Sequence, residues 1–301
     1  MSEKYEFIDA EYAANTAADA ADAPTVGNMC RWLSVSKSGF YDWRNRLASA
    51  TAQRRELLKL KIKQLFDDAD GTYGYRRIHA ALARTGEQVS PELVRKLMRQ
   101  LDLVSCQPRP YRTTTVRGEQ AGVGDLVARE FTAEAPGTKL VSDITYIWTW
   151  EGWLYLATMI DCFNKEVIGY AMADHMRTEL VTTALDMAAS NHQLAKDCII
   201  HSDHGTQYTS TEFAVKVTDL ELRRSLGRTG ICYDNALAES FFGTLKTERV
   251  HRTVYPTRKK AKEDIARYIE LFYNRRRLHS GLGYRSPHEV RNEYLNRQLA
   301  A

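Results

Sequence analysis

Three acidic residues that lie far apart in the chain constrain its fold more than any other feature. Asp143 lies within a run of β-branched residues that predicts a buried strand. Asp203 follows the short apolar run 198–201, so we expect it at a strand end. Glu239 falls in a segment that predicts a helix with Asp234 as its N-cap. Carboxylates on two strands and one helix suit Mg²⁺, which prefers oxygen ligands and retains open positions for substrate phosphates.

The helix around Glu239 predicts two distinct faces. At 3.6 residues per turn, one narrow stripe contains an amide, a carboxylate, a glycine and a cation: Asn235, Glu239, Gly243 and Lys246. The opposite face is apolar, with Leu237, Phe241 and Leu245. The polar stripe suits a closely approaching phosphate backbone, but it could equally be the solvated face of an amphipathic helix.

The order of elements after residue 138 predicts an α/β fold. Strands are expected at residues 139–148, 153–162 and 167–173, followed by a helix from Thr178 and a short strand that ends at Asp203. Thr209 and Glu212 predict a capping box for the next helix, and residues 222–226 predict a fifth strand before the Glu239 helix. This order is that of a ribonuclease-H-like fold, with a mixed five-stranded sheet and helices, expected at residues 138–250.

The region before the sheet is predicted to be helical. Residues 1–23 are acidic and Ala-rich, which indicates a mobile tail or a marginal helix. Residues 24–106 predict a small all-helical domain in which Ser90 caps a helix that begins with Pro91. Paired with the helix that begins at Tyr75, it could form a helix-turn-helix. Outward cations on this pair are the candidate DNA contacts, although a protein-docking surface would look the same: Arg76, Arg77, Arg95, Lys96 and Arg99.

The distribution of charge and of turn-forming residues divides the rest of the chain. Prolines and glycines indicate a linker at residues 107–137. Residues 251–301 predict a basic helical extension whose Arg275 and Arg276 could follow a DNA strand, or could be the solvated end of a packing helix. The acidic block 119–245 holds the three carboxylates, and net basic blocks flank it at 31–118 and 246–301. Basic flanks around an acidic centre favour a nucleic-acid partner.

Composition favours an intracellular enzyme. The five cysteines are odd in number and scattered, which indicates reduced thiols rather than a disulfide framework: Cys30, Cys106, Cys162, Cys198 and Cys232. No apolar stretch approaches the length of a membrane span, and the acidic N-terminus does not resemble a signal peptide. A cytoplasmic, nucleoid-associated location is therefore expected.

Several motifs in order resemble one family, the DDE transposases of bacterial insertion sequences, whose catalytic core is similar to that of retroviral integrase. The resemblance covers roughly residues 31–290, and the segments that carry it are 73–78, 142–147, 201–208, 232–242, 273–274 and 282–287. It implies an integrase-like core, with Asp143, Asp203 and Glu239 as the catalytic and metal-binding carboxylates.

The resemblance also implies a reaction. Two Mg²⁺ ions, for which Mn²⁺ could substitute, would support 3′-end cleavage of the element and transfer of the freed 3′-hydroxyl to a second phosphodiester. Asn235 and Lys246 are candidate contacts to phosphates or terminal bases; otherwise they are a helix-start amide and a surface lysine. The expected partners are double-stranded DNA at the element ends and target, further copies of the chain in an oligomer on DNA, and an upstream-frame transposase product.

Two other classes of function stay open at this point. His201 and His204 bracket Asp203 and could supply nitrogen ligands to a metal in a hydrolase, but this would leave Asp143 and Glu239 without a role. A non-catalytic DNA-binding regulator, or an inactive transposase copy, would keep the basic helices and lose the chemistry. Carboxylate substitution that abolishes cleavage and spares DNA binding would separate enzyme from regulator.

Overall fold

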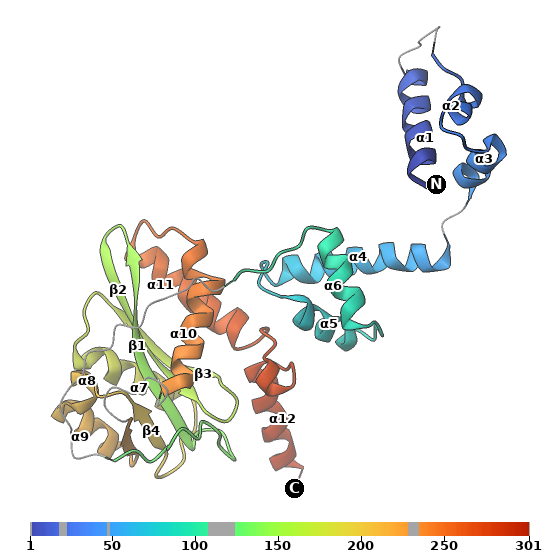
Figure 1. Ribbon diagram of the computed structural model, residues 1–301. Coiled ribbons are helices and arrows are strands. Elements are labelled where there is room, and N and C mark those ends of the chain that lie inside the picture. The colour runs from blue at the N-terminus through green and yellow to red at the C-terminus, as the bar shows by residue number, and fades with distance from the viewer. Residues whose placement is uncertain (1, 18–22, 47–48, 108–123, 228–234, 301) are drawn as a thin grey trace. The chain divides into compact units, whose positions relative to one another are not determined.

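The computed structural model describes residues 2–17, 23–46, 49–107, 124–227 and 235–300. It divides the chain into two compact units, Met1–Lys61 and Ile62–Ala301, which we treat separately. The boundary lies inside helix α4 (Ala50–Asp68), so the single helical domain predicted for residues 24–106 is split between the two units (Figure 1).

The smaller unit has a hydrophobic core of its own. Helix α1 (Ser2–Ala17) packs against α2 (Val26–Trp32) and α3 (Lys37–Asn45). Tyr5 and Ile8 of α1 are buried in a cluster with Phe40. Of the two alternatives predicted for residues 1–23, a mobile tail or a marginal helix, the described residues 2–17 form a helix, which docks through its two buried apolar residues.

In the larger unit, α5 (Tyr75–Arg84) and α6 (Pro91–Gln100) form the predicted helix pair. Ser90 caps α6 as expected, since its Oγ accepts a hydrogen bond from the Leu93 N–H at 3.2 Å and Pro91 occupies the first turn. The buried side chains of the pair face each other's helix: Ile78, Leu82, Val94, Leu97 and Met98.

The predicted mixed five-stranded sheet is confirmed. Its strands, in chain order, are β1 (Lys139–Thr149), β2 (Gly152–Asp161), β3 (Val167–Ala173), β4 (Ile199–Ser202) and β5 (Arg223–Leu226). The order in space is β3-β2-β1-β4-β5. The first three strands form an antiparallel meander, and β4 and β5 join parallel to β1, which requires the helical crossovers seen in Figure 1.

Alternation along β1 gives the sheet two covered faces. Leu140 and Ile144 point to a cluster shared with α7 (Thr178–Asn191) and α9 (Thr211–Asp219). Val141 and Ile147 point to the opposite cluster, shared with α10 (Ala236–Glu248) and α11 (Arg258–Arg267). Both faces are buried where helices cover them, and the helix that carries Glu239 therefore packs directly on the strand that carries Asp143.

Two helix starts in this unit differ from the predicted caps or lie beside residues that the structure does not describe. The capping box predicted at Thr209 is wrong: Thr209 ends the short helix α8 (Thr206–Thr209), and Ser210 caps α9 by accepting from the Phe213 N–H at 3.2 Å. Asp234, the predicted cap of the Glu239 helix, lies outside the described residues. The position before α10 is Asn235.

The described part of the predicted linker is packed against the sheet. The Leu126 N–H donates to Ser225 Oγ at 2.8 Å, and Val127 is buried. The Gly137 N–H donates to Asp161 Oδ2 at 2.7 Å. Residues 124–137 thus belong to the sheet-containing unit, because turns rich in Gly and Pro can pack closely as well as span a gap.

The C-terminal extension is helical, as predicted, but it is tied into the unit. After η2 (Val250–Arg252) and α11 come the π-helical segment η3 (Tyr268–Tyr273), the 3₁₀ turn η4 (Ser280–Leu282) and α12 (Pro287–Leu299). Ser286 and Glu289 form a reciprocal capping box at the start of α12. Arg84 of α5 pairs with Glu289, so this cap also joins the helix pair to the extension.

The described cysteines form no disulfide. Cys30, Cys106, Cys162 and Cys198 are free thiols, and Cys232 lies outside the described residues. Within the ranges that the structure describes, no helix combines the length and apolar character needed to cross a membrane.

Candidate active site

Asp143 lies where β1 extends beyond its neighbour. Strand β4 pairs with β1 only from Lys139 to Val141, so the β1 edge is free of strand pairing from Ser142 onward. Asn235 Nδ2 fills this gap by donating to the Ser142 carbonyl at 3.2 Å. The start of α10 is therefore held against β1 next to Asp143.

Asp203 directly follows β4, as predicted. Because β4 is parallel to β1, the chain leaves it beside the middle of β1. Asp203 Oδ1 accepts from the Gly205 N–H at 3.0 Å, which turns the chain into α8. A Cβ added at Gly205 would lie 3.0 Å from that same oxygen, so a side chain there would press on the carboxylate.

A buried hydroxyl pair joins the two segments that carry the aspartates. Ser142 Oγ and Tyr208 Oη lie 2.8 Å apart, and both side chains are buried. Burial and the nearby charge of Asp143 raise the pKa of Tyr208. This phenol therefore stays protonated and keeps its hydrogen bond with Ser142. Sequence reasoning missed Tyr208, although its place in the 201–208 motif was a usable signal.

The three predicted carboxylates influence one another electrostatically. Burial raises the pKa of Asp143 to about 8, and the charges of Asp203 and Glu239 act in the same direction. A hydrogen bond from the Ile144 N–H at 2.8 Å and the charge of Lys246 oppose the shift. Burial also raises the pKa of Glu239. A half-buried carboxyl facing two like charges is an environment that a bound cation would relieve.

These residues fit a hard cation by their chemistry, since every donor is a carboxylate oxygen. In the described part of the chain, however, no group of three or more His, Cys, Asp and Glu side chains is arranged to hold a metal ion. Asp203 and Glu239 are exposed and Asp143 is half-buried. The fold thus brings the three carboxylates within electrostatic range without converging them into a ligand cluster.

The two histidines beside Asp203 do not form a nitrogen ligand set. His201 is buried, its Nδ1 lies 2.8 Å from Ser225 Oγ, and its ring packs edge-on against Phe131. His204 is half-buried, and its Nδ1 has no hydrogen-bond partner among the residues that the structure describes. His201 thus serves the packing between β4 and β5, which removes the support for a His-liganded metallohydrolase.

The two predicted contacts on α10 differ in exposure. Lys246 is half-buried and its Nζ lies 4.9 Å from the centroid of the Tyr146 ring, on the same strand as Asp143. Burial lowers the pKa of Lys246, and the charge of Asp143 opposes this. Asn235 is buried, and its Nδ2 donates to the Ser142 carbonyl, so it positions the start of α10; its contact with phosphates or terminal bases stays a prediction.

The predicted cations of the helix pair are mostly exposed. Arg95, Lys96 and Arg99 all lie on the outer face of α6, and Arg76 is exposed with its guanidinium over the Tyr75 ring. The fifth predicted cation, Arg77, is less exposed than these four. It is half-buried, and its Nε donates to the Leu278 carbonyl at 3.0 Å.

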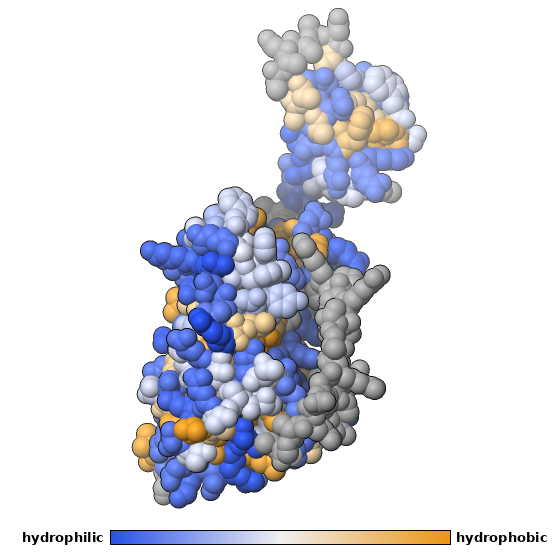
Figure 2. All heavy atoms as spheres, turned by 90° about the vertical axis from the view of Figure 1, so that its left-hand side faces the viewer, coloured by the Kyte–Doolittle hydropathy of each residue, from blue (hydrophilic) through white to orange (hydrophobic). Residues whose placement is uncertain are grey.

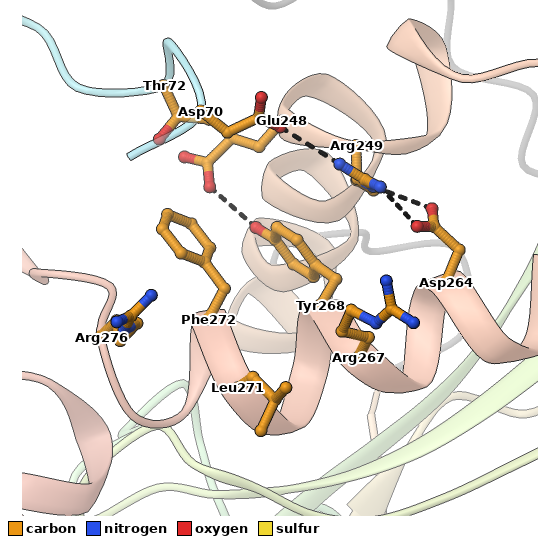
Figure 3. A pocket seen from close by; sticks show the side chains of 10 residues that line it. All are labelled: Asp70, Thr72, Glu248, Arg249, Asp264, Arg267, Tyr268, Leu271, Phe272 and Arg276. Carbon is orange, nitrogen blue, oxygen red and sulfur yellow. Dashed lines mark hydrogen bonds and ion pairs between the residues drawn. The ribbon is translucent and has the colours of Figure 1, made fainter. Parts of the chain in front are cut away.

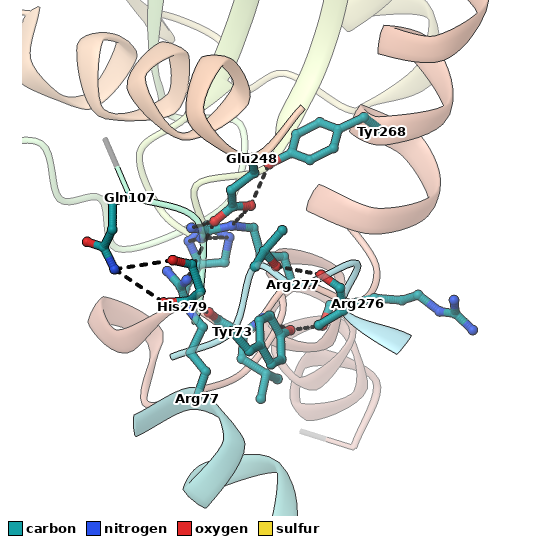
Figure 4. A network of polar contacts seen from close by, with 12 residues as sticks. Tyr73, Arg77, Gln107, Glu248, Tyr268, Arg276, Arg277 and His279 are labelled. Atoms are coloured by element: carbon teal, nitrogen blue, oxygen red, sulfur yellow. Dashed lines mark hydrogen bonds and ion pairs between the residues drawn. The ribbon is translucent and has the colours of Figure 1, made fainter. Parts of the chain in front are cut away.

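Arg77 belongs to a polar network around Glu248, the last residue of α10 (Figure 4). Arg277 donates to both Glu248 oxygens, at 2.8 and 2.6 Å, and the Tyr268 hydroxyl donates at 2.7 Å. Arg77 Nη1 lies 3.5 Å from Glu248 Oε1. Arg275 and Arg276, by contrast, are exposed as predicted. Sequence reasoning missed Glu248 because nothing local marks a buried charge.

A cavity next to this network is lined in part by two of its members, Glu248 and Tyr268 (Figure 3). Its lining includes none of the three carboxylates, and Arg249 bridges Asp264 and Asp70 across it. Tyr255 Oη also donates to Asp264 at 2.8 Å. These acids are neutralised by partners within the chain, so the cavity is a structural junction between the helix pair and the extension.

Comparison with known proteins decides the family. The integrase core domain family matches residues 133–232 and, in a second family of the same description, residues 220–287; an HTH-like domain family matches residues 52–111. The insertion element IS600 31 kDa protein of Shigella sonnei is 40% identical over 274 residues, which are 91% of this chain and 100% of that protein. The chain belongs to the integrase-core transposases of insertion sequences.

Other members agree with this assignment. The transposase for IS904 of Lactococcus lactis is 36% identical, over 81% of this chain and 96% of its own. Transposase InsF for IS3A of Escherichia coli is 34% identical, over 90% and 95% respectively. Among solved structures, the HTLV-2 integrase catalytic core domain in complex with magnesium matches 53% of this chain and 99% of its own, with 15% identity and a TM-score of 0.43.

Family membership confirms the predicted insertion-sequence transposase, with its integrase-like core and helix-turn-helix-like front. Membership of this family also implies its general activity, which is polynucleotidyl transfer during DNA transposition.

Proposed function

We propose that Asp143, Asp203 and Glu239 are the catalytic carboxylates of a Mg²⁺-dependent transposase that cleaves the 3′ ends of its element and joins them to target DNA. The observation that carries this proposal is the electrostatic coupling of Asp143 to both other acids, which come from separate elements of the fold. Like charges within electrostatic range of a half-buried carboxyl are costly, and perturbed pKa values of this kind are typical of functional sites.

The three carboxylates would hold two Mg²⁺ ions, for which Mn²⁺ could substitute. When bound, the ions would stabilise the negative charge that develops on the attacking and leaving oxygens of the phosphodiester. The chain's own residues set the geometry. Asn235 holds α10 against β1, and the Ser142–Tyr208 pair holds the segment after Asp203 against the same strand. Lys246, beside Asp143, would contact a DNA phosphate close to the scissile bond.

Exposed cations on other elements would bind the rest of the DNA through its phosphates. Those on the helix pair are Arg76, Arg95, Lys96 and Arg99, and those on the extension are Arg275 and Arg276. We also propose that the transposase acts as an oligomer on DNA in the bacterial cytoplasm, with an upstream-frame product as a partner, because two element ends must be held together during joining.

The test is cleavage and joining of labelled element-end DNA by the full chain with Mg²⁺ or Mn²⁺, with and without the upstream-frame product. Glu239→Gln should lower both rates at least about a thousandfold, since single groups that stabilise transition-state charge are commonly worth that much. Glu221→Gln, an exposed glutamate paired with Lys196, is the matched control and should cleave like the wild type. DNA binding without cleavage, unchanged by Glu239→Gln, would instead favour a regulator or an inactive copy.

A further inference from the structure

The tip of the β1–β2 hairpin exposes an unusual number of large rings. Tyr146, Trp148, Trp150 and Trp153 are 53%, 57%, 70% and 43% exposed, and we call these four residues the hairpin aromatic surface. Three of the five tryptophans of the chain are in this group. Figure 2 looks onto the side of the molecule where the hairpin lies in Figure 1, a side that is otherwise mostly hydrophilic with scattered hydrophobic residues. Such a concentration of exposed rings marks an interaction site.

The rings are held in fixed positions by one another. Trp148 and Trp153 are direct cross-strand partners, and their ring centroids lie 4.8 Å apart at 74°. Tyr146 meets Trp153 at 5.0 Å and 81°. Edge-to-face packing uses the edge of one ring against the face of another, so each ring keeps open area toward solvent. A preorganised set of ring faces can bind a flat partner at low entropic cost.

Cations surround this surface. Lys246 Nζ lies over the Tyr146 ring, and Arg258 Nε donates to the Trp153 carbonyl at 3.0 Å. Lys259 and Lys260 follow in the first turn of α11 and are exposed. Lysine is depleted in protein–protein interfaces, whereas rings interleaved with cations are typical of surfaces that bind single-stranded nucleic acid. The charge of the surface therefore selects a phosphate-bearing partner over another apolar protein face.

The surface continues the strand that carries Asp143. Tyr146 and Trp148 are three and five residues beyond Asp143, roughly 10 and 17 Å further along the strand at about 3.3 Å per residue, and strand alternation places both rings on the opposite face of β1 from Asp143. Lys246 links the two faces, because its Nζ lies over the Tyr146 ring and its charge acts on Asp143. Stacked nucleotides advance about 3.4 Å each along one strand. A DNA strand with its phosphodiester at Asp143 would reach these rings within a few nucleotides by passing Lys246 around the edge of β1 that β4 leaves unpaired.

We propose that the hairpin aromatic surface stacks unpaired nucleotides of the DNA strand whose phosphodiester lies at the three carboxylates. Bases must be unpaired there because ring faces are accessible to aromatic side chains only when a base leaves the duplex stack. The inference rests on the proposed function for the position of the DNA. Both an element end and a target strand could supply such nucleotides, and they share the same chemistry.

The test measures binding by the full chain in EDTA, so that it does not depend on cleavage. The probes are a fully paired duplex and the same duplex with three unpaired thymidines at one end, each made with the element-end sequence and with an unrelated sequence. The wild type should bind the unpaired form about tenfold more tightly, as expected for one or two stacked bases. A preference limited to the element-end sequence would assign the surface to the element; a preference with both would assign it to any unpaired strand.

Trp148→Ala should lose this preference, and Trp148→Tyr, which keeps a ring, should retain most of it. Trp32→Ala removes a 69% exposed tryptophan of the smaller unit and is the matched control, so it should bind like the wild type. The proposal would be overturned if Trp148→Ala and Trp153→Ala both kept the preference for DNA with unpaired thymidines. It would also be overturned if these variants lost self-association while that preference stayed unchanged. A chain that shows the preference but no metal-dependent cleavage would support the stacking surface while contradicting the proposed catalytic site.

Discussion

At the scale of single residues, Lys246 lies between a carboxylate and an aromatic ring. It faces Asp143, whose charge favours its protonated form, and it covers Tyr146, where a cation over the ring face is stabilised. Its position on α10, two turns after Glu239, makes it the cation next to the proposed phosphodiester. A lysine in this place contributes to DNA binding mainly through phosphate charge.

Lys246→Gln should therefore weaken DNA binding for all sequences alike. Loss of one phosphate contact lowers the slope of log K against log salt concentration by about 0.9. The measurement is a salt titration of DNA affinity for wild type and variant. Lys196→Gln, which removes an exposed lysine paired with Glu221, should leave the slope unchanged. Equal slopes for Lys246→Gln and the wild type would show that this lysine does not contact phosphate.

His279 is a residue whose burial makes stability depend on pH. Its ring packs edge-on against Tyr273 at 4.9 Å, and burial lowers its pKa to about 2, aided by the charges of Arg277, Arg77 and Lys165. The folded protein thus keeps His279 neutral, whereas the unfolded chain binds a proton below its ordinary pKa near 6.5. The stability contributed by the neutral ring is present above that value and is lost as pH falls.

The difference in unfolding free energy between wild type and His279→Gln should therefore shrink on acidification. From about pH 7.5 to about pH 5.5 the wild type should lose roughly 1.4 kcal/mol more than the variant, because one pH unit below the unfolded pKa is worth that amount. Urea unfolding at both pH values measures this. If the difference in unfolding free energy between wild type and variant stays constant or increases on acidification, His279 is protonated in the folded protein.

At the scale of elements, α10 is fixed at both ends. Asn235 holds its start against β1, and Glu248 at its end is bound by Arg277, Tyr268 and Arg77. This second anchor joins three parts of the unit, since Arg77 belongs to α5 and Arg277 to the extension (Figure 4). The helix that carries Glu239 is thereby tied to the helix-turn-helix-like pair.

Glu248→Gln should lower the unfolding free energy by about 3 kcal/mol, because it leaves buried arginine charge without its counter-ion. Glu221→Gln removes an exposed glutamate from a surface pair and should cost less than about 1 kcal/mol. Chemical denaturation of both variants makes the comparison. Similar small losses in the two would show that the Glu248 cluster is solvated and does not anchor α10.

At the scale of the whole molecule, the chain has separate hydrophobic cores. Phe40 is fully buried in the cluster of the smaller unit, and Phe213 is buried in one of the two clusters of the sheet. Units with separate cores need not unfold together. We expect calorimetry to resolve two transitions.

Phe40→Ala should lower the midpoint temperature only of the transition that belongs to the smaller unit. Phe213→Ala should lower only the midpoint of the larger unit. Each substitution should cost about 3–5 kcal/mol in its own unit, the usual cost of removing a buried phenylalanine ring. A single transition lowered by both variants would show that the two units fold as one.

Much of the fold followed from local sequence signals. The alternation in β1 and the apolar runs of β2 and β3 predicted three strands close to their observed ends, and Ser90 with Pro91 predicted the start of α6. Such signals are strong because strand alternation and helix caps depend on neighbouring residues alone. The same reasoning missed the docking of α1, where only Tyr5 and Ile8 provide the burial.

The sequence by itself determined the order of the elements and the family, and it singled out the three acids as candidates, because these depend on local patterns and on motifs in a fixed order. Only the tertiary structure decided what the neighbouring polar residues do. Arg77 and Asn235 are predicted DNA contacts in the sequence, and only the structure shows that Arg77 is half-buried, that Asn235 is buried and that each donates a hydrogen bond within the chain. The structure also shows that Leu140 and Ile144 of β1 pack against the cluster shared with α7, whereas Tyr146 and Trp148 further along the strand are exposed. Burial and pairing arise between residues distant in sequence, and no local pattern contains them.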